Sequence, residues 1–530
     1  MIRKFLLGFI FPVFYSAIHA QQPAEDYFEW GRQMEIMASV MKQILNNYVE
    51  TPNPEKMGAD AIKGMLSGTD RYTRFYDEQQ MFEQRLRQSG KISGIGIRIR
   101  NHDYGLQIRD VMPGTPARKA GLLPGDIIIA IDGQDLKEFT SQQKDKLITG
   151  KPGSTVKLKI RRGQKTFELE ATRQIIDQKA VPYYGLLPGK TGYIHLRKFT
   201  RTAATEVQEA LVDLKNQGAE RIVLDLRNNP GGLLSQAIGT VNLFIPKGKL
   251  VVETRGRITR FNRQYHTKHS PIDENIPLFI WINGHSASAS EIVSGALQDY
   301  DRAVIVGDTS FGKGLVQRYF PVKYGTYVKI TISKYYLPSG RLIQKVDYWH
   351  RDNKGHTTRY ARGDKEFHTQ SGRKVYEHGG IAPDRYVPSD TLLTVVKGLT
   401  KDDRFFPYFV DYIRHQPAPA SPGDLDENLL AAGFEKYLKK EHIELSAPWT
   451  KYLEKALKSA RKNKAAKDQI RSLENTLEQQ RQALWNELTS PAGRRQTGIL
   501  IKRMLIGYYF GPGELSRYDV QHTPLIRFVR

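Results

Sequence analysis

Residues 283–317 read NGHSASASEIVSGALQDYDRAVIVGDTSFGKGLVQ, and this stretch decides the predicted fold. Its pattern predicts a strand that ends at Asn283, a Gly-His-Ser turn, a helix over 287–300 and a short strand over 303–306. A lysine, Lys313, then stands between two glycines. Strand, helix and strand in this order are typical of an α/β core whose sheet is largely parallel.

The same alternation extends around this stretch. We predict strands over 192–196, 221–226 and 277–283, and helices over 203–216 and 233–243. In a largely parallel sheet, functional groups gather where strands end and helices begin. Residues 327–338 are strand-rich and are expected to complete the core sheet, whereas the polar residues 345–377 are expected to form a surface insertion.

Two features at strand ends allow a structural or a chemical interpretation. The run Asn229-Pro230-Gly231-Gly232 could be only a tight turn, but such a turn also points backbone N–H groups outward, as an oxyanion site requires. Ser288 and Glu291 fit the S-x-x-E capping box, so Ser288 could simply cap its helix. The residues alone leave both alternatives open.

The lysine lies in a sequence that imitates a phosphate loop. Residues 307–313 match G-x-x-x-x-G-K. Gly314 follows, where a phosphate loop needs Ser or Thr to hold magnesium, and the next residues are β-like rather than helical. We therefore exclude a nucleotide site here.

Residues 92–173 change to short strands separated by turns. Strands are predicted over 94–99, 105–111, 126–131 and 155–160, with a short helix and a turn within 113–126. These residues resemble a PDZ domain whose carboxylate-binding loop is Gly94-Ile95-Gly96-Ile97. Glycines allow successive N–H groups to converge on a terminal carboxylate, and the peptide then adds as a strand to the sheet edge. A plain structural turn is the alternative for the loop.

The N-terminal region combines a leader pattern with a helical pattern. Residues 1–20 have Arg3 and Lys4, an apolar run and Ala20 before Gln21, which is typical of a secretory signal peptide. Since Ile18 fits the cleavage site poorly, an uncleaved anchor is the alternative. Residues 26–88 show helical spacing and predict a small helical module that could serve as an oligomerisation arm.

The C-terminal region is also predicted to be helical from about residue 389, with a linker near 416–423. A narrow apolar stripe contains Ile470, Leu473, Leu477, Leu484 and Leu488. This stripe could pack on the core or serve as a helix for a partner or for self-association.

Composition excludes several classes of site. No cysteine occurs, which excludes disulfides and thiol nucleophiles. The net charge of +24 is spread along the chain and could favour peripheral association with an anionic membrane surface, but no nucleic-acid motif appears. His266 and His269 form no ligand pattern, so we expect neither a metal nor a cofactor.

Taken together, the motifs resemble the carboxyl-terminal processing (tail-specific) serine peptidases over roughly residues 70–384. The matching motifs are GIGI, PGTPARKAGLLPGD, LDLRNNPGG, NGHSASASEIVSGALQD, VGDTSFGKGLVQ, YYLPSGRLIQ and GGIAPD. The resemblance implies a PDZ domain inserted before an α/β, crotonase-like peptidase core, and cleavage of polypeptides near disordered C-termini.

The resemblance also assigns roles to residues of this chain. It makes Ser288 the nucleophile, since this serine lies 25 residues before Lys313 (313 − 288 = 25), and makes Lys313 the general base that Gln317 positions. The oxyanion donors it implies are the N–H of Ala289 and of Gly231 or Gly232. The family more often has a residue smaller than His285 before the serine run, and we expect this histidine to line the pocket.

General chemistry agrees with these roles. A free lysine, with a pKa of ~10.4, is protonated at neutral pH, and burial in an apolar pocket lowers this pKa. Phe311, Leu315 and Val316 could form such a pocket around Lys313. Ser288 would then attack the scissile carbonyl while the lysine accepts its proton and later donates it to the leaving amine.

The expected organisation follows from these observations. It comprises a signal peptide (1–20), a helical region (21–90), a PDZ domain (91–174), a serine peptidase core (175–390) and a second helical region (391–530). We expect an exported, periplasmic endopeptidase that acts on proteins with free C-termini and could self-associate through its helical regions. The alternatives are a catalytically silent PDZ scaffold and a thioester hydrolase on the same core.

Overall fold

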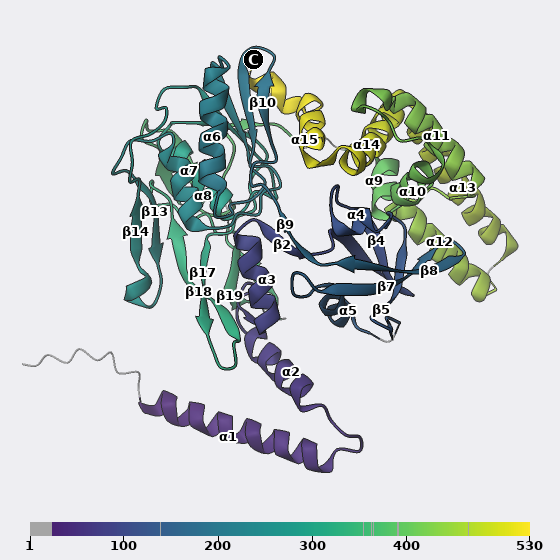
Figure 1. The fold of residues 1–530 in the computed structure, drawn as a ribbon, viewed down its shortest axis with the longest axis horizontal. Helices are drawn as coiled ribbons and strands as arrows, with labels where there is room; N and C mark the ends of the chain where they lie inside the picture. The colour runs from purple at the N-terminus through teal and green to yellow at the C-terminus, as the bar shows by residue number, and fades with distance from the viewer. Residues whose placement is uncertain are drawn as a thin grey trace, which may run out of the picture. The chain divides into compact units, whose positions relative to one another are not determined.

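A computed structural model of the chain reveals the fold (Figure 1). The structure describes residues 24–137, 139–352, 355–361, 363, 365–388, 392–464 and 466–529. The predicted signal peptide over 1–20 lies outside these residues. The chain divides into two compact units, residues 1–75 and 76–530.

The first unit is helical, as predicted. It contains α1 (Ala24–Asn47) and α2 (Pro54–Ser67), which Asn53 caps by accepting the Lys56 N–H, and β1 (Arg74–Tyr76) spans the boundary of the unit. Many large apolar side chains of α1 are exposed, among them Trp30, Met34, Ile36, Met37 and Val40. Within the described residues, every helix is too short or too polar to span a lipid bilayer.

The second unit begins with α3 (Glu78–Gln88) and a PDZ-like domain. An antiparallel sheet has the order β3-β4-β5-β7-β8, and β6 pairs with β5. Its strands are β3 (Ile97–His102), β4 (Gly105–Val111), β5 (Ile127–Ile131), β6 (Gln134–Asp135), β7 (Thr155–Arg162) and β8 (Lys165–Thr172). The helices are α4 (Pro116–Lys119) and α5 (Ser141–Ile148), and β2 (Lys91–Gly94) pairs with β9 (Gln174–Asp177). The predicted strand over 94–99 is therefore interrupted at 95–96.

The predicted α/β core is present as a six-stranded sheet of order β10-β11-β12-β15-β16-β23. The strands are β10 (Tyr183–Leu187), β11 (Thr191–His195), β12 (Arg221–Asp225), β15 (Leu278–Ile282), β16 (Val304–Gly307) and β23 (Arg385–Tyr386). Only the pair β10–β11 is antiparallel. The helices α6 (Ala203–Asn216), α7 (Leu234–Asn242) and α8 (Ala289–Asp299) pack with one face of the sheet in a large apolar core.

The prediction that residues 327–338 complete this sheet is wrong. β18 (Tyr327–Tyr336) forms a hairpin with β17 (Leu315–Pro321) and pairs with β13 (Leu250–Arg255) in a different sheet, which also contains β14 (Arg263–His266). A short turn joins β17 to β18, so the two strands are antiparallel neighbours, and β17 diverges from the core sheet directly after the lysine loop. The short helix η1 (Thr259–Phe261) lies between β13 and β14.

The insertion over 345–377 forms two short hairpins. β19 (Val346–Arg351) pairs with β20 (Thr357–Arg359), and β21 (Glu366–His368) pairs with β22 (Lys374–Tyr376). Tyr348 and Val375 are buried, so the insertion is anchored to the rest of the unit.

The C-terminal region is helical and has its own apolar core. It consists of α9 (Thr394–Lys401), α10 (Phe405–His415), η2 (Pro422–Asp424), α11 (Glu427–Lys440), α12 (Pro448–Lys462), α13 (Lys467–Thr489), α14 (Pro491–Tyr509), α15 (Gly511–Gln521) and η3 (Pro524–Val529). Leu477, Leu484 and Leu488 of the predicted stripe are buried, so this part of the stripe packs within the chain.

The PDZ-like domain is docked onto this helical region. Asp403, between α9 and α10, accepts hydrogen bonds from both Nη atoms of Arg109 (2.6 Å each) and from Arg100 Nη1 (2.9 Å). The Arg109 guanidinium also lies 3.3 Å from the centre of the Phe406 ring. A paired carboxylate and a stacked guanidinium make this a specific contact between the two domains.

Candidate active site

The serine turn has a strained backbone. Ser288 precedes α8 with φ 57° and ψ −112°, a conformation that is costly for a residue with a side chain. Its hydroxyl makes no capping hydrogen bond; instead the Ser288 carbonyl accepts the Glu291 N–H at 2.9 Å. A capping serine normally has extended backbone angles and accepts with its side chain. The geometry therefore disfavours the interpretation of Ser288 as a simple helix cap.

The neighbouring serines have structural hydrogen bonds. The Ser286 hydroxyl donates to the Leu226 carbonyl at 2.7 Å, and the Ser290 hydroxyl donates to the Asn229 carbonyl at 2.9 Å. Both side chains are fully buried, whereas Ser288 is partly exposed. Of the three serines, Ser288 is thus the one that a substrate can approach.

Glu291 connects the serine turn to the lysine loop. One carboxylate oxygen accepts from Ser288 N–H (2.7 Å) and Lys313 N–H (2.9 Å), and the other accepts from Ser310 Oγ (2.5 Å) and Gly312 N–H (2.6 Å). Glu291 is fully buried. Burial raises the pKa of this carboxyl, and these hydrogen bonds oppose the rise. Sequence reasoning recognised Glu291 only as part of a capping box, and missed its contact with the lysine loop.

The lysine side chain is held from β17. Lys313 Nζ donates to Gln317 Oε1 at 2.8 Å, and Gln317 Nε2 donates to Thr331 Oγ1 at 3.3 Å. The expected contact between Lys313 and Gln317 is therefore present. Among the three apolar residues expected around the lysine, Leu315 is buried and Val316 is partly buried, but Phe311 is 38% exposed.

Tyr335 on β18 also contacts both loops, which sequence reasoning missed. Its buried hydroxyl lies 2.7 Å from the Lys313 carbonyl and 3.2 Å from the Ser288 carbonyl. Tyr335 is one of three tyrosines in β18, so no signal in the sequence distinguishes it.

The two glycines of the predicted oxyanion turn face different neighbours. A Cβ atom on Gly231, whose φ is 94°, would lie 2.9 Å from Ser288 Cβ and 2.9 Å from the Ala289 nitrogen. Gly232 instead pairs with Phe199. Gly231 is therefore the glycine that lies against the serine turn. Its N–H donates to Asn229 Oδ1 at 2.9 Å, so an oxyanion would have to share or replace that acceptor. Ala289 is the first residue of α8, where an N–H has no acceptor within the helix.

Comparison with known proteins now decides the family. The profile of Peptidase family S41 matches residues 190–348, the PDZ domain profile matches 93–172, and that of a C-terminal helical domain of PDZ-proteases matches 395–489. The chain is 35% identical over 356 residues to the carboxy-terminal-processing protease of Bartonella bacilliformis, covering 65% of this chain and 81% of that protein. The chain belongs to peptidase family S41.

Two further similar proteins were found. A CtpA-like serine protease of Staphylococcus aureus is 34% identical over 309 residues, which cover 58% of this S41 peptidase and 61% of the relative. Among solved structures, the photosystem II D1 C-terminal processing protease is 26% identical, covers 68% of this chain and 89% of its own, and has a TM-score of 0.39.

The predicted peptide-binding loop of this S41 peptidase precedes β3, the edge strand of the PDZ sheet. The Ile95 side chain is buried in the domain core, and the Ile95 and Gly96 carbonyls accept from Ala117 N–H and Met112 N–H. A Cβ atom on Gly96 would overlap Thr115, so the loop requires glycine there. Gly94 (φ 154°) and Ile97 lie on either side, at the ends of β2 and β3.

His285 lies three residues before Ser288 in the serine turn. It is exposed, and its N–H donates to Asn283 Oδ1. The described residues contain no group of three or more His, Asp or Glu side chains placed to share a metal ion.

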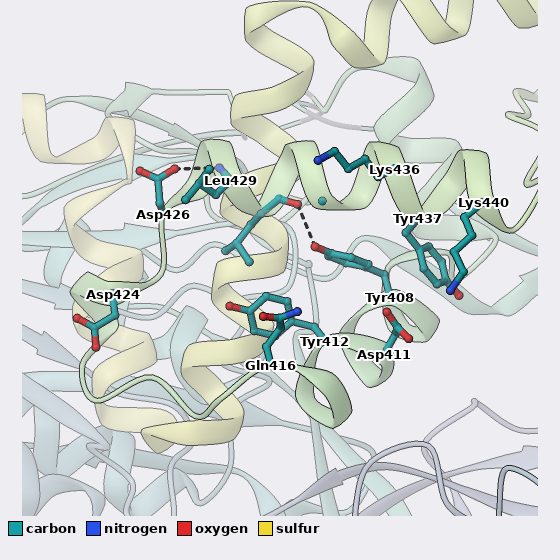
Figure 2. A pocket seen from close by; sticks show the side chains of 12 residues that line it. Tyr408, Asp411, Tyr412, Gln416, Asp424, Asp426, Leu429, Lys436, Tyr437 and Lys440 are labelled. Carbon is teal, nitrogen blue, oxygen red and sulfur yellow. Dashed lines mark hydrogen bonds between the residues drawn. The ribbon is translucent and has the colours of Figure 1, made fainter.

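A cavity of about 540 Å³ lies in the helical region, between α10 and α11. Figure 2 shows Tyr408, Tyr412 and Tyr437 around it, with charged side chains such as Asp411 and Lys436 nearby. None of the predicted site residues lines this cavity, so the candidate active site is separate from it.

Proposed function

We propose that this S41 peptidase is a serine endopeptidase in which Ser288 is the nucleophile and Lys313 is the general base. The observation that carries the proposal is the contrast among the three serines of the turn. Ser286 and Ser290 are buried and bonded to backbone carbonyls, while Ser288 is partly exposed, strained and adjacent to Gly231.

The surrounding groups support the roles of the pair. Gln317 Oε1 accepts a hydrogen bond from Lys313 Nζ, and this neutral acceptor favours the charged form of lysine less than a carboxylate would. The N–H groups of Ala289 and Gly231 are the proposed oxyanion donors. Donors fixed before the reaction stabilise the developing charge at no reorganisation cost.

The substrates we propose are proteins with disordered C-terminal tails. The tail would add as a strand to the free edge of β3, with its carboxylate at residues 94–97. The solved PDZ domain of the Vibrio cholerae carboxy-terminal protease is in complex with a peptide and is 29% identical, covering 16% of this chain and 97% of that chain, with a TM-score of 0.16. We further propose export to the periplasm, on the basis of the leader pattern over 1–20.

The test is cleavage of a folded reporter that carries a disordered, apolar C-terminal tail. Wild type should cut it, whereas Ser288→Ala and Lys313→Ala should each lose activity by a factor of about 10³ or more. Lys323→Ala, at an exposed turn, is the matched lysine control and should retain full activity. The same reporter with an amidated C-terminus tests the role of the tail carboxylate.

Two outcomes would overturn parts of the proposal. Equal cleavage by wild type and Ser288→Ala would assign the nucleophile to another residue. Binding of the tail without cleavage would favour the alternative, a catalytically silent PDZ scaffold. N-terminal sequencing of the protein from the periplasmic fraction tests export, and an intact Met1 in the cytoplasmic fraction would contradict it.

A further inference from the structure

The end of the chain covers the second face of the peptidase sheet. Val520 and Leu525 are buried and belong to the same apolar cluster as Tyr193, Val223 and Trp281, whose side chains leave the sheet on the side opposite α6, α7 and α8. Figure 1 shows α15 beside β10, the first strand of the sheet. The C-terminal helices thus return to the peptidase core.

A first hydrogen-bonded link joins this end to Arg227, which precedes the oxyanion turn in the chain. Arg227 Nη1 donates to Thr523 Oγ1 at 2.9 Å, and Arg227 Nη2 donates to Asp225 Oδ2 at 2.6 Å. Burial alone would raise the pKa of Asp225, but the Arg227 guanidinium holds it below its ordinary value. Arg227 is the residue from which the chain turns toward Gly231, four positions later.

A second link runs from α15 through β11. The Ser516 hydroxyl donates to the Pro512 carbonyl at 2.9 Å, and it lies 2.9 Å from His195 Nδ1. Because a hydroxyl has a single proton, Ser516 must accept from His195, which fixes the Nδ1–H tautomer. Burial lowers the pKa of His195, which favours its neutral form.

Leu196, the residue after His195, is linked to Gly231 through the side chain of Asn229. The Leu196 carbonyl accepts from Asn229 Nδ2 at 2.7 Å, and Asn229 Oδ1 accepts the Gly231 N–H at 2.9 Å. Asn229 is fully buried, so it transmits the position of β11 directly to the turn. The second link therefore ends at the glycine that lies against Ser288, and the first ends at Arg227, four positions before it in the chain.

We propose that the C-terminal segment 516–525 holds the Gly231 turn in place for catalysis, with Thr523 and Ser516 as positioning residues that act through Arg227 and His195. The inference rests on the proposed peptidase function. A shift of a catalytic group by about 1 Å can cost about 100-fold in rate, so contacts remote from the substrate can control turnover.

The first test is hydrogen–deuterium exchange and does not require activity. Thr523→Val keeps the shape of the side chain but leaves Arg227 Nη1 without this acceptor. We expect at least threefold faster exchange over 226–233 than in wild type. The matched control is Ile501→Ala, which perturbs the buried core of the helical region without touching either link, and it should leave exchange over 226–233 unchanged. Unchanged exchange in Thr523→Val would overturn the inference.

The second test separates positioning from folding by kinetics. Thr523→Val should lower kcat about tenfold with KM within twofold of wild type, since substrate binding by the PDZ domain is unaffected. Thr523→Ser retains the hydroxyl and should restore kcat. Wild-type kcat in Thr523→Val would overturn the inference even if exchange rises. If wild type cleaves no tail at all, the proposed peptidase function fails, and the exchange result alone decides whether the segment holds the turn.

Discussion

Replacement of Glu291 by glutamine tests how the serine turn and the lysine loop are held together. The carboxylate accepts four hydrogen bonds, and an amide can accept on only one of its two ends. In the better orientation, the amide oxygen keeps the N–H groups of Ser288 and Lys313, and the NH2 group faces Ser310 Oγ and Gly312 N–H. The serine hydroxyl, which also accepts the Ile381 N–H, can rotate to accept from the amide, but its own proton and the Gly312 N–H then lose the acceptor that Glu291 supplied.

The magnitude follows from this count. Each buried, unpaired donor costs about 1–3 kcal/mol, so the loss of two acceptor contacts should lower the free energy of unfolding of Glu291→Gln by about 2–6 kcal/mol. Its kcat should fall by no more than about tenfold, because both bonds to the proposed catalytic residues survive. Glu291→Ala leaves all four donors unpaired, and its kcat should fall by more than about 100-fold.

Calorimetry and steady-state cleavage of the tailed reporter measure the two effects. The control is Glu435→Gln, which changes an ion pair with the half-exposed Arg494 and should leave both stability and kcat close to those of wild type. Wild-type kcat in Glu291→Ala would refute the reasoning, since the shared carboxylate would then have no part in placing the pair.

Four further predictions concern other contacts. Tyr335→Phe removes the hydroxyl near both catalytic-loop carbonyls and should lower kcat about tenfold while costing about 1 kcal/mol in calorimetry; an unchanged kcat would contradict this. Gly231→Ala should abolish measurable cleavage, because φ is 94° and a Cβ atom would clash with the serine turn; activity near wild type would exclude this glycine from the site. Asp403→Asn loses the charge that pairs with Arg109, so limited proteolysis should cut the chain on either side of the PDZ domain faster than in wild type. Burial lowers the pKa of His195 below its ordinary value of 6.5, so near that pH the unfolded chain binds a proton more readily than the folded chain. The Tm of wild type should therefore fall relative to that of His195→Gln as the pH drops from 7.5 to 5.5. A constant difference between the two Tm values would contradict the lowered pKa.

Local pattern was sufficient for most elements of the core. The amphipathic spacing of 203–216 predicted α6 with its observed bounds, and the apolar runs predicted β12 and β15 to within a residue or two. These signals come from residues close in sequence, each of which faces either the apolar core or solvent. Pattern could not assign β18 to its sheet, because alternation indicates a strand but not its partner.

The site residues also divide into those that the sequence predicted and those that only the structure revealed. The roles of the serine and the lysine were predicted from the resemblance to a known family, because the residues alone also allowed Ser288 to be a helix cap; Gln317 lies within reach of Lys313 on the adjoining strand. Apart from the Ser310 hydroxyl, Glu291 and Tyr335 contact the two loops through backbone groups of those loops, and any residue can supply a backbone group. Sequence therefore carries no mark of these two contacts, and only the folded chain reveals them.

The role of the C-terminal region follows from the needs of a parallel sheet. Such a sheet is stable only when both faces are covered, and α6, α7 and α8 all pack in the core on one face. The strands nevertheless carry large apolar residues on the other face, among them Tyr193 and Trp281, so a cover had to come from elsewhere in the chain. Val520 and Leu525 supply part of it. The boundary expected at residue 390 thus separates the peptidase sheet from Val520 and Leu525, which cover part of one of its faces. The helical region is therefore a structural component of the peptidase as well as a support for its PDZ domain.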